Sequence, residues 1–291
     1  MLPATHAGSW YPTGKPLTNM LTSAFEKATL SANTKGTVKA IVVPHAGYEY
    51  CIATSAYAFK AIDPSNINRC VIIGPSHRIY VTHCTIADAT SFETPYGEIP
   101  FDNQSAEHLT KKYPKLFERL DRKTASAEHS LEMECPILKF LFDQKNKSFS
   151  VLPIMIGSIS DKTAKEVASA LAPIVNDPQT LLVVSSDFCH WGNDFEYTYL
   201  PKDAKGSIND KIEALDREGM KNISTCDVSK FADFINKTGD TICGEVPIKI
   251  AMQAINGNYN VEWPHYSQSS PNLRSQRESC VSYAAGIFRV E

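Results

Sequence analysis

The chain has 291 residues, a mass of 32.2 kDa and a formal net charge of −3. Apolar residues make up 43% and charged residues 21%, which is a globular composition and excludes disordered, collagen-like and coiled-coil classes. The charge argues against a nucleic-acid partner, which needs a basic face. No apolar run approaches the roughly 20 residues of a membrane span, and we expect no signal peptide.

Short runs rich in β-branched residues recur along the chain, and each is apolar at consecutive positions. This pattern is typical of interior strands in a sheet that is covered by helices on both faces. We therefore predict strands at 38–43, 70–73, 150–156, 180–184 and 280–290.

Segments of helical periodicity alternate with these runs. The clearest is 161–175, for which Asp161 is a candidate N-cap. Further helices are predicted at 17–28, 53–61, 103–112, 207–218, 227–237 and 246–256. Alternating strands and helices predict an α/β protein. We expect one domain over 1–291, with 191–210 as a long polar excursion.

Histidines follow three of the predicted strands within a few residues of their ends. His45 follows the strand 38–43, His77 follows 70–73, and the pair Asp187 and His190 follows 180–184. Ligands of open α/β sheets bind at the carboxyl ends of the strands. A single histidine after a strand is usually a hydrogen-bonded turn residue, but three in equivalent positions predict a functional site.

Other segments could contribute to the same site. Cys243 precedes the predicted helix 246–256, where a helix N-terminus would favour a thiolate, although a buried structural cysteine is the alternative. Glu128 and His129 precede an apolar stretch, which could equally be a helix that begins with Ser130 as N-cap. Trp10 lies in an aperiodic segment that would either line a pocket or pack over a sheet edge.

These residue types leave two chemical classes open. Two imidazoles plus one anionic ligand make an open transition-metal site. With Asp187 as third ligand the site would suit Fe(II), and with Cys243 it would be softer and would take Cu(I), Zn or Fe. The other class is a thiol hydrolase, with Cys243 or Cys189 as a nucleophile activated by a histidine.

Several motifs together resemble the Memo family (mediator of receptor-tyrosine-kinase-driven cell motility), in the order found in that family. They are HAGSWY at 6–11, PHAGY at 44–48, GPSH at 74–77, EHS at 128–130, SSDFCHWG at 185–192, ICG at 242–244 and SYAAG at 282–286. The resemblance implies a fold similar to class III extradiol dioxygenases. That fold is an α/β sandwich on a mixed, largely parallel sheet, with its pocket at one sheet end.

The resemblance also implies a site and a ligand. A redox metal, copper or iron, would be held by His45, His77 and Cys243, with His190 and Asp187 in the same pocket as candidate catalytic residues. The family pocket also binds phosphotyrosine peptides, and the matching positions are Trp10, His45, His77, His190 and Cys243. Glu128 and His129 are secondary candidates. Because the extradiol dioxygenases have a carboxylate where this chain has Cys243, dioxygenase activity does not follow from the fold.

The expected function is therefore metal-dependent redox activity or metal handling, with a role in signalling, motility or metal homeostasis. The alternatives are a phosphotyrosine-peptide adaptor without catalysis, an extradiol-type dioxygenase and a thiol hydrolase. The chain has eight cysteines and no CxxC pair, and several of them sit in apolar runs. This pattern predicts free thiols in a reducing compartment, the cytoplasm, with the nucleus as a second location.

Overall fold

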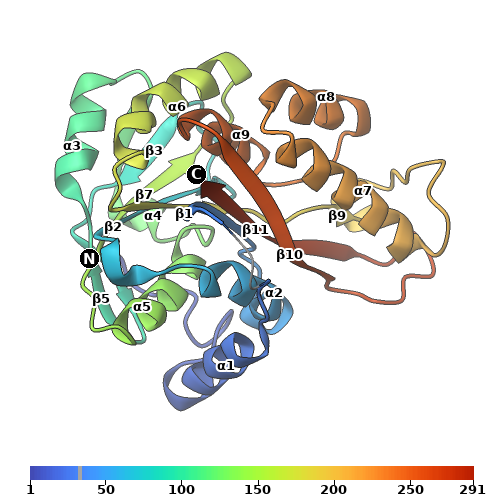
Figure 1. Cartoon of the computed structure of the whole chain (residues 1–291), viewed down its shortest axis with the longest axis horizontal. Helices are drawn as coiled ribbons and strands as arrows, with labels where there is room; N and C mark the ends of the chain where they lie inside the picture. The colour runs from blue at the N-terminus through green and yellow to red at the C-terminus, as the bar shows by residue number, and fades with distance from the viewer. Residues whose placement is uncertain (32–34) are drawn as a thin grey trace.

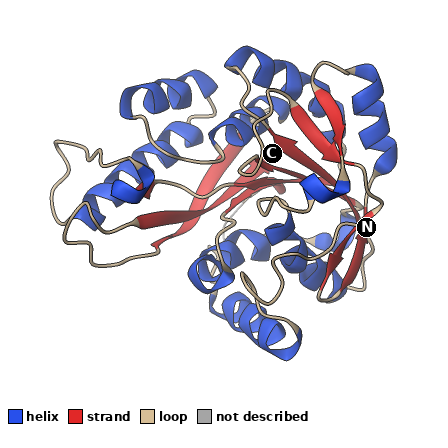
Figure 2. Ribbon diagram, turned by 180° about the vertical axis from the view of Figure 1, so that it is seen from behind, coloured by secondary structure: helices blue, strands red, loops and turns tan. Residues whose placement is uncertain are grey.

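The structure is a computed structural model that describes residues 1–31 and 35–291. Its centre is a nine-stranded mixed sheet in the order β10-β11-β1-β8-β2-β7-β3-β6, with β9 paired to β11. Helices cover both faces of this sheet (Figures 1 and 2). The predicted α/β class with a mixed sheet flanked by helices is confirmed.

The strands of the sheet are β1 (Thr37–Val43), β2 (Arg69–Pro75), β3 (Cys84–Ala87), β6 (Phe117–Leu120), β7 (Ser150–Ile156), β8 (Thr180–Ser185), β9 (His190–Trp191), β10 (Tyr259–Gln268) and β11 (Cys280–Val290). A separate hairpin pairs β4 (Ser91–Thr94) with β5 (Gly97–Pro100).

The α-helices are α1 (Gly14–Lys27), α2 (Tyr48–Lys60), α3 (Asn103–Lys112), α4 (Arg122–Ala125), α5 (Cys135–Asp143), α6 (Asp161–Val175), α7 (Ile208–Ser224), α8 (Val228–Thr238) and α9 (Glu245–Ala254). Short 3₁₀ turns lie at η1 (Pro64–Asn66), η2 (Glu132–Glu134) and η3 (Asn193–Phe195).

Alternate residues of the central strands face two different helical layers. In β1, Ala40 and Val42 belong to the apolar cluster that includes residues of α6 to α9, whereas Ile41 and Val43 belong to the cluster that includes residues of α1, α2 and α5. Figure 1 shows these two sets of helices on opposite sides of the sheet. Because successive side chains of a strand point to opposite faces, a strand covered on both faces is apolar at every position.

The register of the central strands brings their carboxyl ends to one edge. β1 runs parallel to β8, with Val43 beside Ser185. β8 also runs parallel to β2, with Val184 beside Ile73. The loops that follow β1, β2 and β8 therefore start at the same edge of the sheet. This is the arrangement expected for residues that follow neighbouring parallel strands.

Some helix boundaries differ from the prediction. Helix α6 has the predicted bounds, but its N-cap is Ser160, whose Oγ accepts a hydrogen bond from the Thr163 amide at 3.2 Å, and not Asp161. Helix α2 begins at Tyr48, earlier than predicted, because this buried tyrosine packs in its first turn. Ser130 is not an N-cap, since its hydroxyl donates to the Pro75 carbonyl oxygen and α5 begins only at Cys135.

The strand β10 was not predicted from the sequence. Its side chains are nearly all half-buried, and it includes polar residues along its length. It forms one border of the sheet, and its pairing with β11 is irregular between Glu262 and His265. A border strand of this kind carries neither a continuous apolar run nor a clean alternation, which are the two patterns that identify strands.

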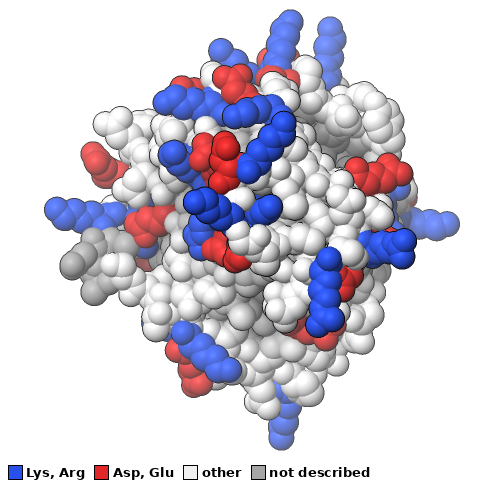
Figure 3. All heavy atoms as spheres, turned by 90° about the vertical axis from the view of Figure 1, so that its right-hand side faces the viewer, with Lys and Arg blue, Asp and Glu red and all other residues white. Residues whose placement is uncertain are grey.

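Three general features bear on the expected function classes. None of the helices in the described part of the chain is long and apolar enough to cross a membrane. All eight cysteines are free. On the face shown in Figure 3, basic and acidic side chains lie interspersed, in keeping with the small net charge.

Candidate functional site

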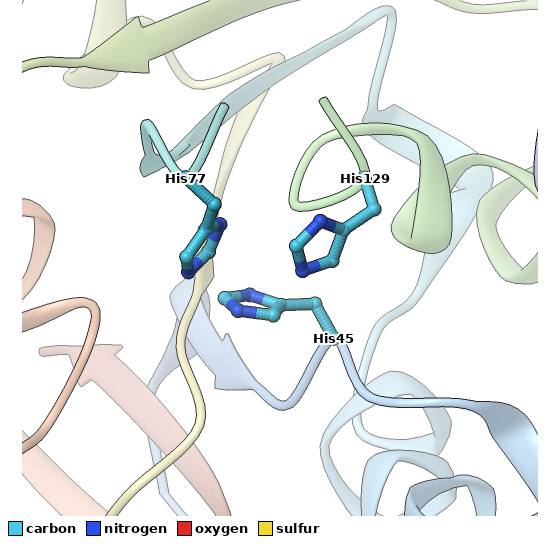
Figure 4. Close-up of side chains that lie close together, drawn as sticks. All are labelled: His45, His77 and His129. Carbon is cyan, nitrogen blue, oxygen red and sulfur yellow. The ribbon is translucent and has the colours of Figure 1, made fainter. Parts of the chain in front are cut away.

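Three histidines from separate loops converge at the carboxyl edge of the sheet (Figure 4). His45 follows β1, His77 follows β2, and His129 lies in the loop before η2. One ring nitrogen of each lies within 4.8 Å of one ring nitrogen of the others. The ring centroids of His45 and His77 are 5.1 Å apart, and those of His77 and His129 are 4.5 Å apart.

His45 is held in one orientation by buried hydrogen bonds. Its side chain is buried, and Nδ1 lies 2.7 Å from Ser185 Oγ, which donates to the Ser130 carbonyl oxygen at 2.6 Å. Ser185 therefore accepts from His45, which assigns the proton to Nδ1 and leaves a lone pair on Nε2. Glu134 Oε1 lies 3.1 Å from the same hydroxyl, and burial raises the pKa of this carboxyl well above its usual range.

His77 is oriented by a carboxylate. Glu128 accepts from the His77 backbone amide at 2.6 Å through Oε2, and its Oε1 lies 3.0 Å from His77 Nδ1. Burial of Glu128 opposes its ionisation, but the hydrogen bonds and charge of His77, with the Ser130 amide, lower its pKa to about 2. An ionised carboxylate at Nδ1 leaves Nε2 as the nitrogen that can bind a ligand.

His129, a secondary candidate from the sequence, lies in the same group as His45 and His77. Its Nδ1 is buried and has no hydrogen-bond partner among the described residues, although Glu128 Oε1 lies 3.3 Å away. Its ring packs 4.6 Å from the Trp10 ring. Burial lowers the pKa of His129 to about 4. A buried imidazole nitrogen without a partner is costly, and a bound cation would remove that cost.

Cys243 contacts the ring of His45. Its Sγ is 3.3 Å from His45 Nε2 and accepts a hydrogen bond from the Asp187 amide at 3.2 Å. It precedes α9 as predicted, but burial and the Asp187 carboxylate raise the pKa of its thiol well above the usual range. Burial and the Asp187 carboxylate thus oppose the thiolate that the helix N-terminus was expected to favour.

Asp187 and His190 both line the pocket in front of these residues. Asp187 Oδ1 accepts the backbone amide of His45 at 2.9 Å, so this carboxylate fixes the loop that carries His45. Burial raises its pKa to about 7. His190 Nδ1 donates to the Thr241 carbonyl oxygen at 3.1 Å, which leaves Nε2 free for a molecule in the pocket.

The pocket has a volume of about 700 Å³ and an aromatic wall. Trp10, Tyr50, Phe195 and Tyr283 line it together with His45, His77, His129, Asp187 and His190. Cys243 is not among the described lining residues, and it contacts the pocket residues His45 and Asp187. None of the described residues that line the pocket is Lys or Arg.

The segment that carries Trp10 is fastened by a buried carboxylate that no motif in the sequence indicated. Glu132 accepts from the His6 amide at 2.9 Å and from the Tyr11 hydroxyl at 2.8 Å, and its second oxygen lies 2.7 Å from His6 Nδ1. These contacts join residues that are far apart in the chain, so no local sequence signal could reveal them. They set the position of the Trp10 ring at the pocket.

Burial favours the neutral form of three imidazoles of this site, those of His45, His129 and His190. Burial, together with the positive charge that His77 and His129 would carry, lowers the pKa of His45 well below its usual range. Burial also lowers the pKa of His190. Neutral imidazoles with the Nε2 lone pair available are the form in which histidine ligates metals. The donor atoms of His45, His77 and His129, which lie within 4.8 Å of one another, therefore fit a metal ion, and Cys243 lies outside this group but contacts His45.

Comparison with known proteins places this chain in a family. A family model described as Memo-like protein matches residues 3–287. Protein MEMO1 of Homo sapiens is 36% identical over 293 residues, which covers 99% of this chain and 97% of that protein. The Protein memo-1 homolog of Caenorhabditis elegans is also 36% identical, covering 99% of this chain and 82% of its own length.

A solved structure shares the fold at low sequence identity. The crystal structure of an uncharacterized protein from Escherichia coli K12 has a TM-score of 0.52 and 12% identity to this chain, covering 84% of this chain and 98% of that one. The mixed sheet with a histidine-lined pocket at its carboxyl edge thus defines an α/β protein whose fold is consistent with the extradiol-dioxygenase-like class. The match over nearly the whole length is more specific. The chain belongs to the Memo-like protein family.

Proposed function

We propose that the chain binds a redox-active metal ion, copper or iron, through His45, His77 and Cys243, and that it acts in metal-dependent redox chemistry or metal handling. The observation that carries this proposal is the contact of 3.3 Å between Cys243 Sγ and His45 Nε2 beside the ring of His77, 5.1 Å from that of His45. One sulfur and two imidazoles form a donor set that suits copper and iron.

The hydrogen bonds around the ligands support the same proposal. Ser185 and Glu128 each occupy Nδ1 of one histidine, so both rings are fixed before any ion binds. Partners of this kind orient metal ligands and raise their basicity, and their loss typically weakens metal binding about 10- to 100-fold. His129, whose ring stacks on His77, is an additional donor within reach.

We assign different roles to the two remaining pocket residues. A bound copper or iron ion would supply one-electron chemistry with species derived from O₂. His190 would hold or move a proton at its Nε2 on a molecule bound in the pocket, since its Nδ1 is engaged by Thr241. Asp187 would act as a positioning residue, because it holds the His45 amide and lies at the pocket surface.

Elemental analysis of protein purified in the absence of air and of metal-affinity resins tests this proposal. We expect close to one equivalent of copper or iron in the wild-type protein, and its loss in His77→Ala and in Cys243→Ser. His83→Ala is the matched control, because His83 pairs with Glu118 instead of lining the pocket, and it should retain the metal.

Other metal contents in these variants would change the ligand set or reject the proposal. Metal that survives Cys243→Ser but is lost in His129→Ala would show a three-histidine site. Metal that survives Cys243→Ser but is lost in Asp187→Asn would favour a carboxylate ligand and the extradiol-type dioxygenase. No metal in any sample, including samples reconstituted with either ion, contradicts the proposal.

A second candidate function is a phosphotyrosine-peptide adaptor that uses the same pocket without catalysis. The aromatic wall that includes Trp10 favours a ligand with a planar ring. The phosphate would have to bind to histidines and backbone amides, since the described lining offers no Lys or Arg. This function predicts that a phosphotyrosine peptide binds in the presence of a chelator, that its unphosphorylated form does not, and that Trp10→Ala abolishes the binding.

We also propose a cellular setting. The eight free cysteines support a reducing compartment, the cytoplasm, with the nucleus as a second location. Membership of the Memo-like family supports a role in signalling, motility or metal homeostasis. Depletion of the protein in cells should then alter motility or the labile copper or iron pool, and re-expression of His77→Ala should fail to restore it.

A further inference from the structure

A second group of metal-ligating side chains lies behind the pocket wall. Cys189 lies between β8 and β9, Asp216 lies in α7, and Asp240 lies between α8 and α9. The thiol and one oxygen of each carboxylate all lie within 4.8 Å of one another. The exposed fractions of the three residues are 0%, 0% and 5%, so the group is enclosed by protein.

The group contains two carboxylates and no cationic partner. Among the described residues, no Lys or Arg forms an ion pair with Asp216 or Asp240, and the neighbouring Arg217 is engaged by Glu213. Burial raises the pKa of Asp216 to about 6 and that of Asp240 to about 8. An unpaired buried carboxylate costs several kcal/mol, so the group must be neutralised either by protons or by a cation.

The carboxylate oxygen Asp240 Oδ2 bears on whether protons or a cation neutralise the group. Asp216 uses both of its oxygens, accepting from the Cys189 amide at 3.1 Å and from the Tyr266 hydroxyl at 2.7 Å. Asp240 Oδ1 accepts from the Thr241 amide at 2.8 Å, but its Oδ2 is buried and has no hydrogen-bond partner among the described residues. A buried carboxylate oxygen without a donor lacks an interaction that a bound cation would supply.

We propose that Cys189, Asp216 and Asp240 form a second metal site, separate from the pocket, which takes a divalent first-row ion of the Zn²⁺ type. Zn²⁺ binds thiolate sulfur at about 2.3 Å and carboxylate oxygen at about 2.0–2.2 Å, so a tetrahedral ion holds its donors about 3.5 Å apart. The donor atoms lie within 4.8 Å of one another, so binding would draw them together by about 1 Å at most. A carboxylate bound through both oxygens gives the four donors of a structural site.

Such an ion would connect α7 and the segment between α8 and α9 to the segment that carries His190, which lines the pocket. Thr241, next to Asp240, accepts the His190 amide on its hydroxyl at 2.7 Å and His190 Nδ1 on its carbonyl. Cys189 is the residue before His190. The ion would thus fix the orientation of the His190 ring from behind without contacting the pocket.

Cobalt substitution tests this site independently of the proposed function. The double variant His77→Ala/Cys243→Ser removes the pocket ligands, and it is produced with Co²⁺ in the growth medium so that the ion is present while the chain folds. We expect one equivalent of Co²⁺ and a thiolate-to-cobalt absorption band in the near ultraviolet. Adding Cys189→Ser should remove the band, and adding Asp240→Asn should remove the bound ion.

Cys226→Ser is the matched control, because this thiol is only partly buried and lies outside the group, and it should leave both signals unchanged. The proposal is overturned if the double variant retains no cobalt, or if the band persists in Cys189→Ser. Should Asp240→Asn fail to fold, the midpoint temperature of the double variant decides the matter. It must rise with Co²⁺ concentration if the folded state binds the ion, and a constant midpoint rejects the site.

Discussion

At the residue scale, three of the pocket imidazoles share one arrangement. In His45, His77 and His190 the nitrogen Nδ1 is engaged by Ser185 Oγ, by the Glu128 carboxylate and by the Thr241 carbonyl, respectively. Each ring therefore presents Nε2. Ring orientation and tautomer are set by the protein before a ligand arrives, which lowers the cost of ordering the site on binding.

The carboxylate beside His77 makes stability depend on pH. The pKa of Glu128 lies near 2, below its ordinary value of 4.5. The ionised form therefore stabilises the folded chain above about pH 4.5, and this contribution of about 3 kcal/mol is lost as the pH falls to 2. We expect Glu128→Gln to lower the free energy of unfolding by about this amount at pH 6 and to match the wild type at pH 2.

Denaturant unfolding at both pH values measures this difference. Glu118→Gln is the control, since Glu118 also pairs with a histidine, His83, but its side chain is exposed. A surface pair of this kind contributes at most about 1 kcal/mol. If both variants lose the same free energy of unfolding at pH 6, the buried pair contributes no more to stability than the exposed pair.

The sequence revealed some of these residues and not others, for a physical reason. Four residues follow buried strands, namely His45, His77, Asp187 and His190. Because ligands of open α/β sheets bind at the carboxyl ends of the strands, these residues were predicted to lie at one edge of the sheet. The residues that orient them are reached only across the fold. Ser185 orients His45 and Glu128 orients His77, and the two residues of each pair are distant in the chain. No local pattern encodes such contacts, and His129 was only a secondary candidate because its segment could equally have been a helix start with Ser130 as N-cap.

At the element scale, the approach of α9 to β8 depends on Gly244. This residue is the N-cap of α9, and its amide donates to Ser186 Oγ at 3.0 Å. A Cβ at position 244 would overlap the side chain of Ser186 and would lie 3.0 Å from the Ser185 carbonyl oxygen. The absence of a side chain therefore allows α9 to pack close enough for Cys243 to contact His45.

Gly244→Ala should consequently destabilise the protein by about 1–3 kcal/mol, the usual cost of overpacking, and should also reduce its metal content. Thermal unfolding and elemental analysis measure the two effects. Gly47→Ala is the matched control, because its Cβ would come no closer than 3.5 Å to any other group. If both variants behave like the wild type, the tight packing at Gly244 has no role in the site.

Helices and strands were predicted correctly where burial in the core gives them a regular pattern of apolar residues. The central strands and α6 were recognised because apolar residues fill β1, β2, β7 and β8 and recur at helical spacing in α6. The four-residue strands β3 to β6 were not recognised, because they are too short to establish a period. Pairing with neighbours from other parts of the chain, which the sequence does not reveal, determines these short strands.

At the scale of the whole molecule, the two helical layers share one set of strands. Neither apolar cluster can be exposed while the other stays intact, since alternate residues of β1, β2 and β8 belong to each. We therefore propose that residues 1–291 form one cooperative domain. Calorimetry should give a single unfolding transition with equal calorimetric and van't Hoff enthalpies, and two separate transitions would contradict one domain.

The position of β11 has a further consequence for how the protein is made. β11 lies between β1 and β10, and Val42 of β1 pairs with Gly286 of β11. On the ribosome, one edge of β1 must therefore remain unpaired until nearly all the chain has been synthesised. An unpaired apolar strand edge is a site for aggregation, so production of this protein in cells should depend strongly on chaperones that shield nascent chains.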